Sequence, residues 1–173
     1  MLIEGRPGAG KTTVARRLID RLHERGLAVA GFTTEEIREA GRRVGFAVED
    51  VDGRRAILAG TRLPGPPRVG RYGVDVAAFE RIALPALGVG PEAQIVVIDE
   101  LGKMELHSRA FREAVARLFD RQVHVVATVH RFRDPFTDAL KRRPGVEVMR
   151  VTEGNRDELA GELADRLFPS ASR

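Results

Sequence analysis

The chain has 173 residues, enough for one domain with a full core and short for two ordinary domains. Its 43% hydrophobic and 31% charged residues and net charge of +4 exclude a disordered tail, and the lack of cysteine excludes disulfides and thiolate metal sites. No apolar run reaches the roughly 18–20 residues of a membrane span and no signal peptide precedes the first motif, so we expect one cytoplasmic domain over residues 1–173.

The first elements are a strand, a helix and a second strand. Residues 2–4 form a short apolar strand that leads into a glycine-rich loop. Residues 11 to about 25 follow as an amphipathic helix, because apolar residues recur at i, i+4 and i+8 until Gly26. Residues 28–32 form the second strand, which is also short and apolar.

The middle of the chain has a different pattern. Residues 42–60 alternate between apolar and small or polar side chains on both sides of Asp52-Gly53, which predicts an antiparallel hairpin. Residues 64–67, rich in proline, form a loop, and residues 75–88 form a helix that is interrupted at Pro85.

Strands and helices alternate regularly in the second half of the chain. We expect strands at 95–98, 123–129 and 146–151, and helices at 108–119, after Asp134-Pro135 and at 155–168. The run at 95–98 is apolar on both faces, as in a buried parallel strand. The chain therefore has an α/β fold, with a mostly parallel sheet covered by helices on both faces and an inserted antiparallel hairpin.

The glycine-rich loop reads Gly5-Arg6-Pro7-Gly8-Ala9-Gly10-Lys11-Thr12, which fits the phosphate-binding pattern of Gly, four residues and Gly-Lys-Ser/Thr. Glycines let successive N–H groups point at phosphate oxygens, and the start of the next helix adds its positive dipole end. Lys11 can reach the β- and γ-phosphates, and the Thr12 hydroxyl can bind a bridging Mg²⁺. The sequence does not distinguish between two roles for Thr13, which are capping the helix and contacting the α-phosphate.

The second half of the expected site is the acidic pair after the buried strand. Asp99 stands where parallel sheets place their ligands, and we expect it to hold the Mg²⁺ with Thr12. Glu100 can orient, or accept a proton from, the water that attacks the γ-phosphate. We therefore assign catalysis to Glu100 and Lys11. The residues expected at the nucleotide are Gly5, Arg6, Pro7, Gly8, Ala9, Gly10, Lys11, Thr12, Thr13, Ile98, Asp99, Glu100, Leu101, Gly102 and Lys103.

Five blocks of sequence now resemble a known family, and they cover nearly the whole chain. They are residues 31–38 (GFTTEEIR), 43–46 (RVGF), 72–76 (YGVDV), 99–105 (DELGKME) and 155–157 (NRD). In this order they resemble the small P-loop nucleoside-triphosphatases of the thermophilic-ATPase or cancer-related type. Leu101 and His107 depart from the family's usual isoleucine and its usual aromatic or apolar residue, at positions away from the proposed chemistry.

The resemblance implies a P-loop three-layer α/β sandwich with a RecA-like core and a catalytic glutamate. It also implies hydrolysis of ATP, GTP and other nucleoside triphosphates with Mg²⁺ and little base preference. The cellular role stays open, as do the preferred base, the oligomeric state and any protein partner.

A cation beyond Lys11 is expected to stabilise the transferring phosphoryl group. The candidates are Arg38, Lys103, Arg131 and Arg156. Lys103 is the strongest, with a surface salt bridge to Glu105 as its alternative, and the arginines have structural alternatives. Asp75 and Glu36 are candidates for supporting or capping roles, and His130 for a place facing the pocket.

Two other functions share the phosphate loop. A small-molecule kinase would need dedicated groups for its acceptor, and Glu100 next to Asp99 favours water as the nucleophile instead. A non-catalytic nucleotide-dependent adaptor or an Arg-rich nucleic-acid binder is the other alternative. Aromatic residues make up only 5% of the chain, which disfavours the stacking that single-strand binding uses.

Overall fold

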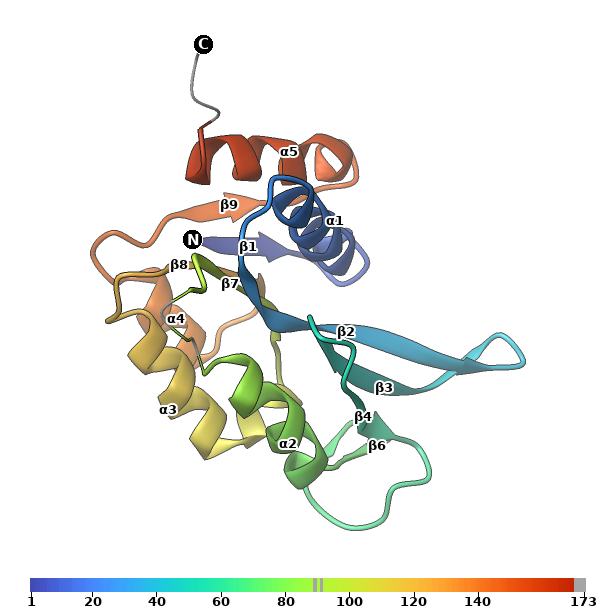
Figure 1. Cartoon of the computed structure of the whole chain (residues 1–173). Coiled ribbons are helices and arrows are strands. Elements are labelled where there is room, and N and C mark those ends of the chain that lie inside the picture. Colours follow the sequence, from blue (N-terminus) through green and yellow to red (C-terminus); the bar gives the residue numbers. More distant parts are fainter. Residues whose placement is uncertain (89, 91, 170–173) are drawn as a thin grey trace.

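The computed structural model of the chain describes residues 1–88, 90 and 92–169, so six positions of the domain expected over 1–173 lie outside the description. Its elements, in chain order, are β1 (Leu2–Gly5), α1 (Lys11–Glu24), β2 (Val29–Glu39), β3 (Arg42–Asp50), β4 (Arg55–Gly60), β5 (Arg68–Val69), β6 (Tyr72–Val74), α2 (Val76–Ala86), β7 (Ile95–Leu101), a 3₁₀ turn (Glu105–His107), α3 (Arg109–Leu118), β8 (His124–His130), α4 (Pro135–Lys141), β9 (Val148–Arg150) and α5 (Arg156–Leu167). The strands form one sheet in the order β5-β6-β4-β3-β2-β7-β8-β1-β9 (Figure 1).

Half of this sheet is parallel and buried. Strands β2, β7, β8, β1 and β9 pair in parallel, and β1, β7 and β8 carry mostly buried residues, as the apolar run at 95–98 predicted. Parallel strands all end at one edge of the sheet. The loop after Gly5, the acidic pair at the end of β7 and His130 at the end of β8 therefore meet at that edge.

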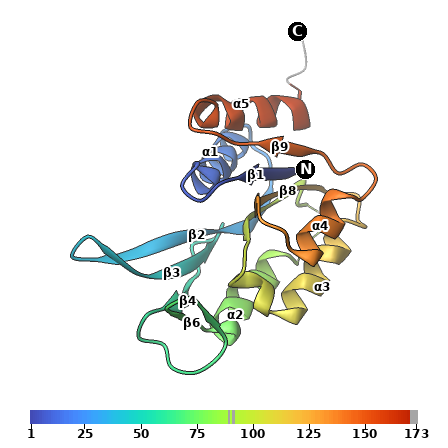
Figure 2. The same cartoon turned by 180° about the vertical axis from the view of Figure 1, so that it is seen from behind.

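Helices cover both faces of the parallel half. Successive strand residues point to opposite faces, so Ile3 and Val97 pack in one hydrophobic cluster with α1 and α5. Leu2 and Val96 lie in the other cluster, with residues of α2, α3 and α4. Figures 1 and 2 show these two groups of helices on opposite sides of the sheet, which gives the expected three layers.

Strand β2 is longer than the sequence indicated, and this corrects the prediction of a strand at 28–32. It pairs in parallel with β7 from Val29 to Phe32 and antiparallel with β3 from there to Glu39. The added residues 33–39 are polar except for Ile37 and are partly or fully exposed, so no apolar run marks them. Backbone pairing with β3, rather than burial, forms this part of the strand.

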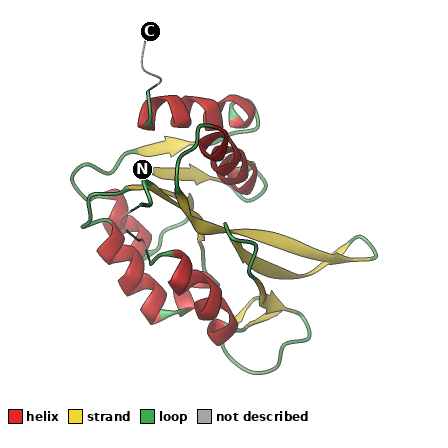
Figure 3. Ribbon diagram, in the orientation of Figure 1, coloured by secondary structure: helices red, strands yellow, loops and turns green. Residues whose placement is uncertain are grey.

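The antiparallel half is consequently larger than one inserted hairpin. The predicted turn at Asp52-Gly53 joins β3 to β4, and a second turn at Ala40-Gly41 joins β2 to β3. The short strands β6 and β5, which the sequence did not predict, complete this half. Figure 3 shows β2 and β3 running out beyond the helices.

The helices agree closely with the sequence. Helix α2 ends at Ala86, one residue after the predicted interruption at Pro85, and the Asp75 side chain caps its start by accepting from the N–H of Ala78 at 2.8 Å. Asp75 therefore has the capping role. Helix α4 begins, as expected, after Asp134, whose carboxylate accepts from its first N–H groups. Across residues 1–88, 90 and 92–169, no helix is long and apolar enough to cross a membrane.

Candidate active site

The phosphate loop connects β1 to α1 and leaves the start of the helix open to an anion. Gly10 precedes the first turn with φ of 100°, a left-handed conformation that favours glycine. Gly10 stands at the N-cap position and has no side chain that could bind the free N–H groups at this end of α1. The N–H groups of the first turn can therefore bind phosphate oxygens, assisted by the helix dipole.

Lys11 joins the loop to the acidic pair. Its side chain is 5% exposed, and Nζ donates to the carbonyl oxygens of Gly5 at 3.4 Å and Arg6 at 3.2 Å. The same Nζ lies 3.7 Å from Glu100 Oε2. The two residues to which the sequence assigned catalysis thus lie together, although 89 positions separate them in the chain.

Asp99 is fully buried among hydroxyl groups. Its Oδ1 accepts from the Thr128 hydroxyl at 2.8 Å, and its Oδ2 accepts from the backbone N–H and the hydroxyl of Thr34, both at 3.3 Å. Burial and the neighbouring Glu100 carboxylate raise the pKa of Asp99, while hydrogen bonds from Thr128, Thr12 and Thr34 act to lower it. A buried carboxylate with this environment is one that a nearby cation would stabilise.

The Thr12 hydroxyl and the Asp99 carboxylate are oxygen donors of the kind that bind Mg²⁺ in nucleotide-binding sites. The Thr12 side chain lies near enough to Asp99 to lower the pKa of its carboxyl group, so the two residues expected at the metal are neighbours. Within the described residues no group of three or more His, Asp and Glu side chains could hold an ion alone. Mg²⁺ is commonly held by one or two protein oxygens, with water and substrate phosphates supplying the others.

Glu100 contacts a histidine that is itself fixed by stacking. His130 Nε2 contacts Glu100 Oε1, although that oxygen accepts no hydrogen bond of regular geometry from the described residues. The His130 ring stacks on Phe132 with centroids 4.4 Å apart, and Lys103 Nζ lies 4.9 Å from the Phe132 centroid. Lys103 is therefore connected to Glu100 through the Phe132 and His130 rings. Among the described residues, Lys103 forms no ion pair with Glu105.

Gly102 and Glu105 close the site behind Glu100. A Cβ at Gly102 would lie 2.7 Å from Glu105 Oε2 and 3.2 Å from Glu100 Oε1, so only glycine fits without displacing these carboxyl groups. Glu105 is buried, and its burial, with the Glu100 carboxylate adding to the effect, raises its pKa to about 8. At neutral pH Glu105 is therefore mostly protonated.

One cavity of about 590 Å³ opens onto most of these groups, but the buried Asp99 does not line it. The expected nucleotide residues that line it are Pro7, Gly8, Gly10, Lys11, Thr12, Thr13, Glu100, Gly102 and Lys103. Gly5 and Arg6 contribute the carbonyl oxygens that hold Lys11. Ala9, Ile98, Asp99 and Leu101 are buried, and Ile98 and Leu101 belong to the hydrophobic core.

The four candidate cations fall into two pairs. Lys103 and Arg156 line the cavity, and the Arg156 side chain packs so closely on Gly10 that a Cβ there would lie 2.7 Å from its Cδ. Arg38 instead donates to Glu36 and to the carbonyl of Gly41, and Arg131 Nε lies 4.0 Å from a Glu4 carboxylate oxygen. Neither of these two arginines lines the cavity.

Several residues that line the cavity lie outside the phosphate-binding motifs, and the sequence did not predict them. They are Arg16, Thr34, Glu35, Arg43, Phe46, Val69, Met104, Glu105 and Phe132. Six of them stand in the blocks that carry the family resemblance, and this was the available signal: Thr34, Glu35, Arg43, Phe46, Met104 and Glu105. Glu36 and His130, which the sequence held as lesser candidates, also line the cavity.

A model of a protein family described as NTPase matches residues 1–164 of the chain. The chain belongs to this NTPase family. The nucleoside-triphosphatase THEP1 of Thermotoga petrophila is 46% identical over 164 residues, which cover 94% of this chain and 89% of that protein. The family resemblance read from the sequence is therefore confirmed, and the chain is an enzyme of the hydrolase class.

Two solved structures of this NTPase family share the fold. The crystal structure of THEP1 from the hyperthermophile Aquifex aeolicus has a TM-score of 0.87 at 35% identity and covers 97% of this chain and 98% of that one. The solution structure of a human cancer-related nucleoside triphosphatase has a TM-score of 0.84 at 35% identity, with 99% and 98% covered. The predicted fold class is confirmed, with a sheet that is mixed because its antiparallel half is larger than expected.

Proposed function

We propose that this NTPase hydrolyses nucleoside 5′-triphosphates with Mg²⁺ to nucleoside diphosphate and phosphate, with broad tolerance for the base. One observation carries the proposal. Lys11 of an anion-binding loop lies 3.7 Å from Glu100 Oε2, next to a buried Asp99, at the wall of one cavity.

Each part of the site has a role in this reaction. The backbone from Gly5 to Thr13 binds the phosphates, and Lys11 moves from the carbonyls of Gly5 and Arg6 to the β- and γ-phosphates. Thr12 and Asp99 would hold Mg²⁺, which when bound neutralises charge on the phosphate oxygens. Lys11 is then no longer paired with Glu100, and the carboxylate is free to act on water.

Glu100 orients the attacking water and accepts its proton. Its remaining neighbour after Lys11 has moved is His130, which holds the carboxylate from behind. Gly102 leaves room for both side chains. Lys103, which follows Gly102 beside Glu100, is the cation available to stabilise the charge that develops on the transferred group.

Arg156 supports the tolerance for different bases. It packs on Gly10 at the start of α1, on the loop's own side of the cavity rather than beside Glu100. A guanidinium plane can stack on any base, since every base has a π face. Stacking of this kind contributes affinity with little preference among bases.

The alternatives from the sequence remain distinct in their outcomes. A small-molecule kinase would transfer the γ-phosphoryl group to a metabolite, and an adaptor would bind nucleotide without turnover. The contact of Glu100 with Lys11 and His130 favours hydrolysis, because it places a carboxylate where water is to be activated. A cytoplasmic location stays a prediction from the sequence.

The test is a hydrolysis panel with the purified protein. ATP, GTP, CTP, UTP and their deoxy forms are supplied with Mg²⁺ or with EDTA, and free phosphate is measured. We expect phosphate from every nucleotide within about tenfold in kcat/KM, and none with EDTA. Hydrolysis in EDTA would contradict the metal role, and a single accepted base would contradict the tolerance. A metabolite phosphorylated faster than phosphate appears would favour the kinase.

A further inference from the structure

The cavity extends past Glu100 to residues that nucleotide hydrolysis does not require. These are Arg43 and Phe46 of β3, Val69 of β5 and Met104 after β7, here called the hairpin subsite. We propose that the hairpin subsite binds a second small ligand, an organic acid with a planar apolar body, next to the γ-phosphate end of the nucleotide. The proposal rests on the proposed function, which gives the direction of the bound nucleotide.

That direction follows from the geometry of attack. Water attacks the γ-phosphorus on the side opposite the leaving diphosphate, so a residue that activates water stands beyond the γ end of the nucleotide. Glu100 has this position. The nucleoside therefore extends away from Glu100, toward Gly10 and the Arg156 side chain packed on it.

The hairpin subsite adjoins the Glu100 side of the cavity. Gly102 lies against Glu100 Oε1, and Lys103 follows it in the chain. Lys103 and Val69 also share the lining of a neighbouring surface hollow, so β5 lies beside Lys103. The subsite is thus beyond the γ-phosphate, where the nucleoside does not reach.

The floor of the subsite is apolar. Phe46, Val69 and Met104 are partly buried, pack against the main hydrophobic cluster and still line the cavity. The Phe46 ring stands edge-on to Tyr72 with centroids 5.3 Å apart, which fixes its plane. Triphosphate and metal gain nothing from such a surface, whereas a planar apolar body would bury it.

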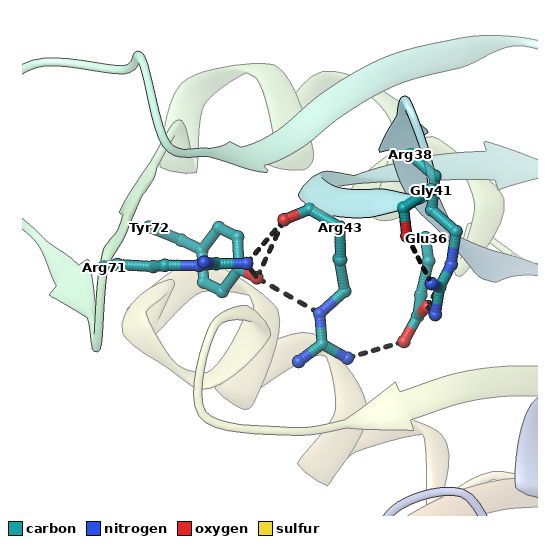
Figure 4. Close-up of polar contacts among 6 residues, drawn as sticks. All are labelled: Glu36, Arg38, Gly41, Arg43, Arg71 and Tyr72. Carbon is teal, nitrogen blue, oxygen red and sulfur yellow. Dashed lines mark hydrogen bonds and ion pairs between the residues drawn. The ribbon is translucent and has the colours of Figure 1, made fainter.

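Arg43 lines the cavity and supplies a cation whose position is fixed by several contacts. Figure 4 shows its two hydrogen bonds, from Nη1 to Glu36 Oε1 at 2.6 Å and from Nε to Tyr72 Oη at 3.1 Å. Its guanidinium carbon lies 5.2 Å from the centroid of the Phe46 ring. Arg71 binds the backbone carbonyl of Arg43 at 2.6 Å. Little entropy remains to be lost when such a side chain binds an anion.

The guanidinium keeps capacity for a ligand. Glu36 is shared between Arg43 and Arg38, so one carboxylate faces two cations. The Nη2 of Arg43 has no hydrogen-bond partner among the described residues, and 43% of the side chain is exposed. A carboxylate or phosphate group is the natural partner for a free guanidinium N–H.

The test uses 2-naphthoate as the probe and the full chain saturated with Mg²⁺ and the β,γ-imido analogue of ATP. Titration calorimetry should show one saturable naphthoate site that the analogue does not displace. Acetate lacks the planar body and 2-naphthalenemethanol lacks the charge, so each should bind at least about tenfold more weakly. A parallel titration with 2-naphthyl phosphate shows whether a carboxylate or a phosphate is preferred.

Arg43→Gln should weaken naphthoate binding about five- to tenfold, by removal of one charge-assisted contact. Arg38→Gln is the matched control, because it removes a cation from the same Glu36 without touching the cavity, and it should stay within about twofold. Phe46→Leu keeps an apolar side chain but removes the ring, and should cost about threefold. Melting curves and analogue affinity show that the variants are folded.

Two results would overturn the proposal: displacement of naphthoate by the analogue, or equal effects of Arg43→Gln and Arg38→Gln. If the wild-type chain did not bind the analogue at all, the proposed function would fail. The naphthoate titration without nucleotide would then still decide whether the hairpin subsite binds an acid, so the two failures are distinguishable.

Discussion

The parallel half of the sheet ends in a group of buried charges, whereas the charged side chains of the antiparallel half, except Asp50, are partly or fully exposed. At the end of the parallel half, Lys11, Asp99 and Glu105 are at most 6% exposed. On the antiparallel half, ion pairs such as Arg62 with Glu39 have side chains that are 83% and 51% exposed. Buried charges cost free energy unless something compensates them, whereas exposed pairs contribute little in either direction.

This difference indicates where the nucleotide phosphates and their metal ion are expected. The charges of the parallel half are only partly compensated by protein groups, since Lys11 rests on carbonyl oxygens and Asp99 on hydroxyls. A phosphate and a metal ion would complete them. In ion pairs such as Arg62 with Glu39, the partner side chain and the surrounding water already compensate both charges, so no ligand is needed there. The predictions below contrast the two halves, beginning with the largest effect.

Replacing the buried cation should have the largest effect. Lys11→Met removes the ammonium that reaches the phosphates, and we expect kcat/KM to fall about 10³-fold, because charge stabilisation of the transferred group is lost. Phosphate release and analogue binding measure this. Arg109→Met is the control, since Arg109 pairs with Glu113 at 2.7 Å on the surface and does not line the cavity, and it should leave turnover unchanged. Equal losses in both variants would contradict the assignment.

Glu105 should make stability depend on pH. Its pKa is about 8 in the folded chain against an ordinary value of 4.5, so the folded state binds more protons between these values. Its contribution to stability is full below pH 4.5 and is lost as pH rises through 8. Urea unfolding from pH 5 to 9 should show wild type losing on the order of a few kcal/mol more than Glu105→Gln.

The exposed Glu113→Gln serves as the control for Glu105, because Glu113 pairs with Arg109 at the surface. That variant should follow the wild-type profile. Parallel profiles for wild type and Glu105→Gln would show that Glu105 is not the buried acid described here.

His130 should act only through Glu100. His130→Ala should lower kcat about tenfold with little change in nucleotide affinity, because the carboxylate loses the neighbour that holds it. In the Glu100→Gln background the same change should have no further effect, and His130→Asn should recover part of the loss. Additive losses in the double variant would show that the role of His130 is structural.

The smallest effect should come from the antiparallel half. Arg62→Gln breaks an exposed ion pair with Glu39, and we expect less than about 0.5 kcal/mol in unfolding free energy and no change in turnover. Urea unfolding and phosphate release measure both. A larger loss of stability would show that the exposed pairs of this half are structural after all.

The sequence predicted the parallel half well because burial leaves a clear pattern there. The apolar run at 95–98 and the loop before Lys11 each had a recognisable spacing, and the structure brings them together. The extension of β2 beyond Phe32 was missed, since its side chains are mostly polar and only backbone pairing with β3 forms it. Pairing between strands is not visible in local composition.

The same limit applies to the site. Lys11 and Thr12 could be named because the phosphate-loop motif fixes their spacing, and Glu100 because it follows Asp99 at the end of an apolar strand. His130 could be raised only as a candidate, because its contact with Glu100 depends on β7 and β8 being neighbours. Phe132 was not predicted at all, since its stacking on His130 exists only in the fold.

The central claim, that Glu100 activates water, is tested most directly by Glu100→Gln. The amide keeps the shape of the side chain and removes its capacity to accept a proton. Measuring kcat together with the affinity for the ATP analogue, we predict a fall in kcat of at least about 100-fold and an affinity within about threefold of wild type. An unchanged kcat would contradict the account.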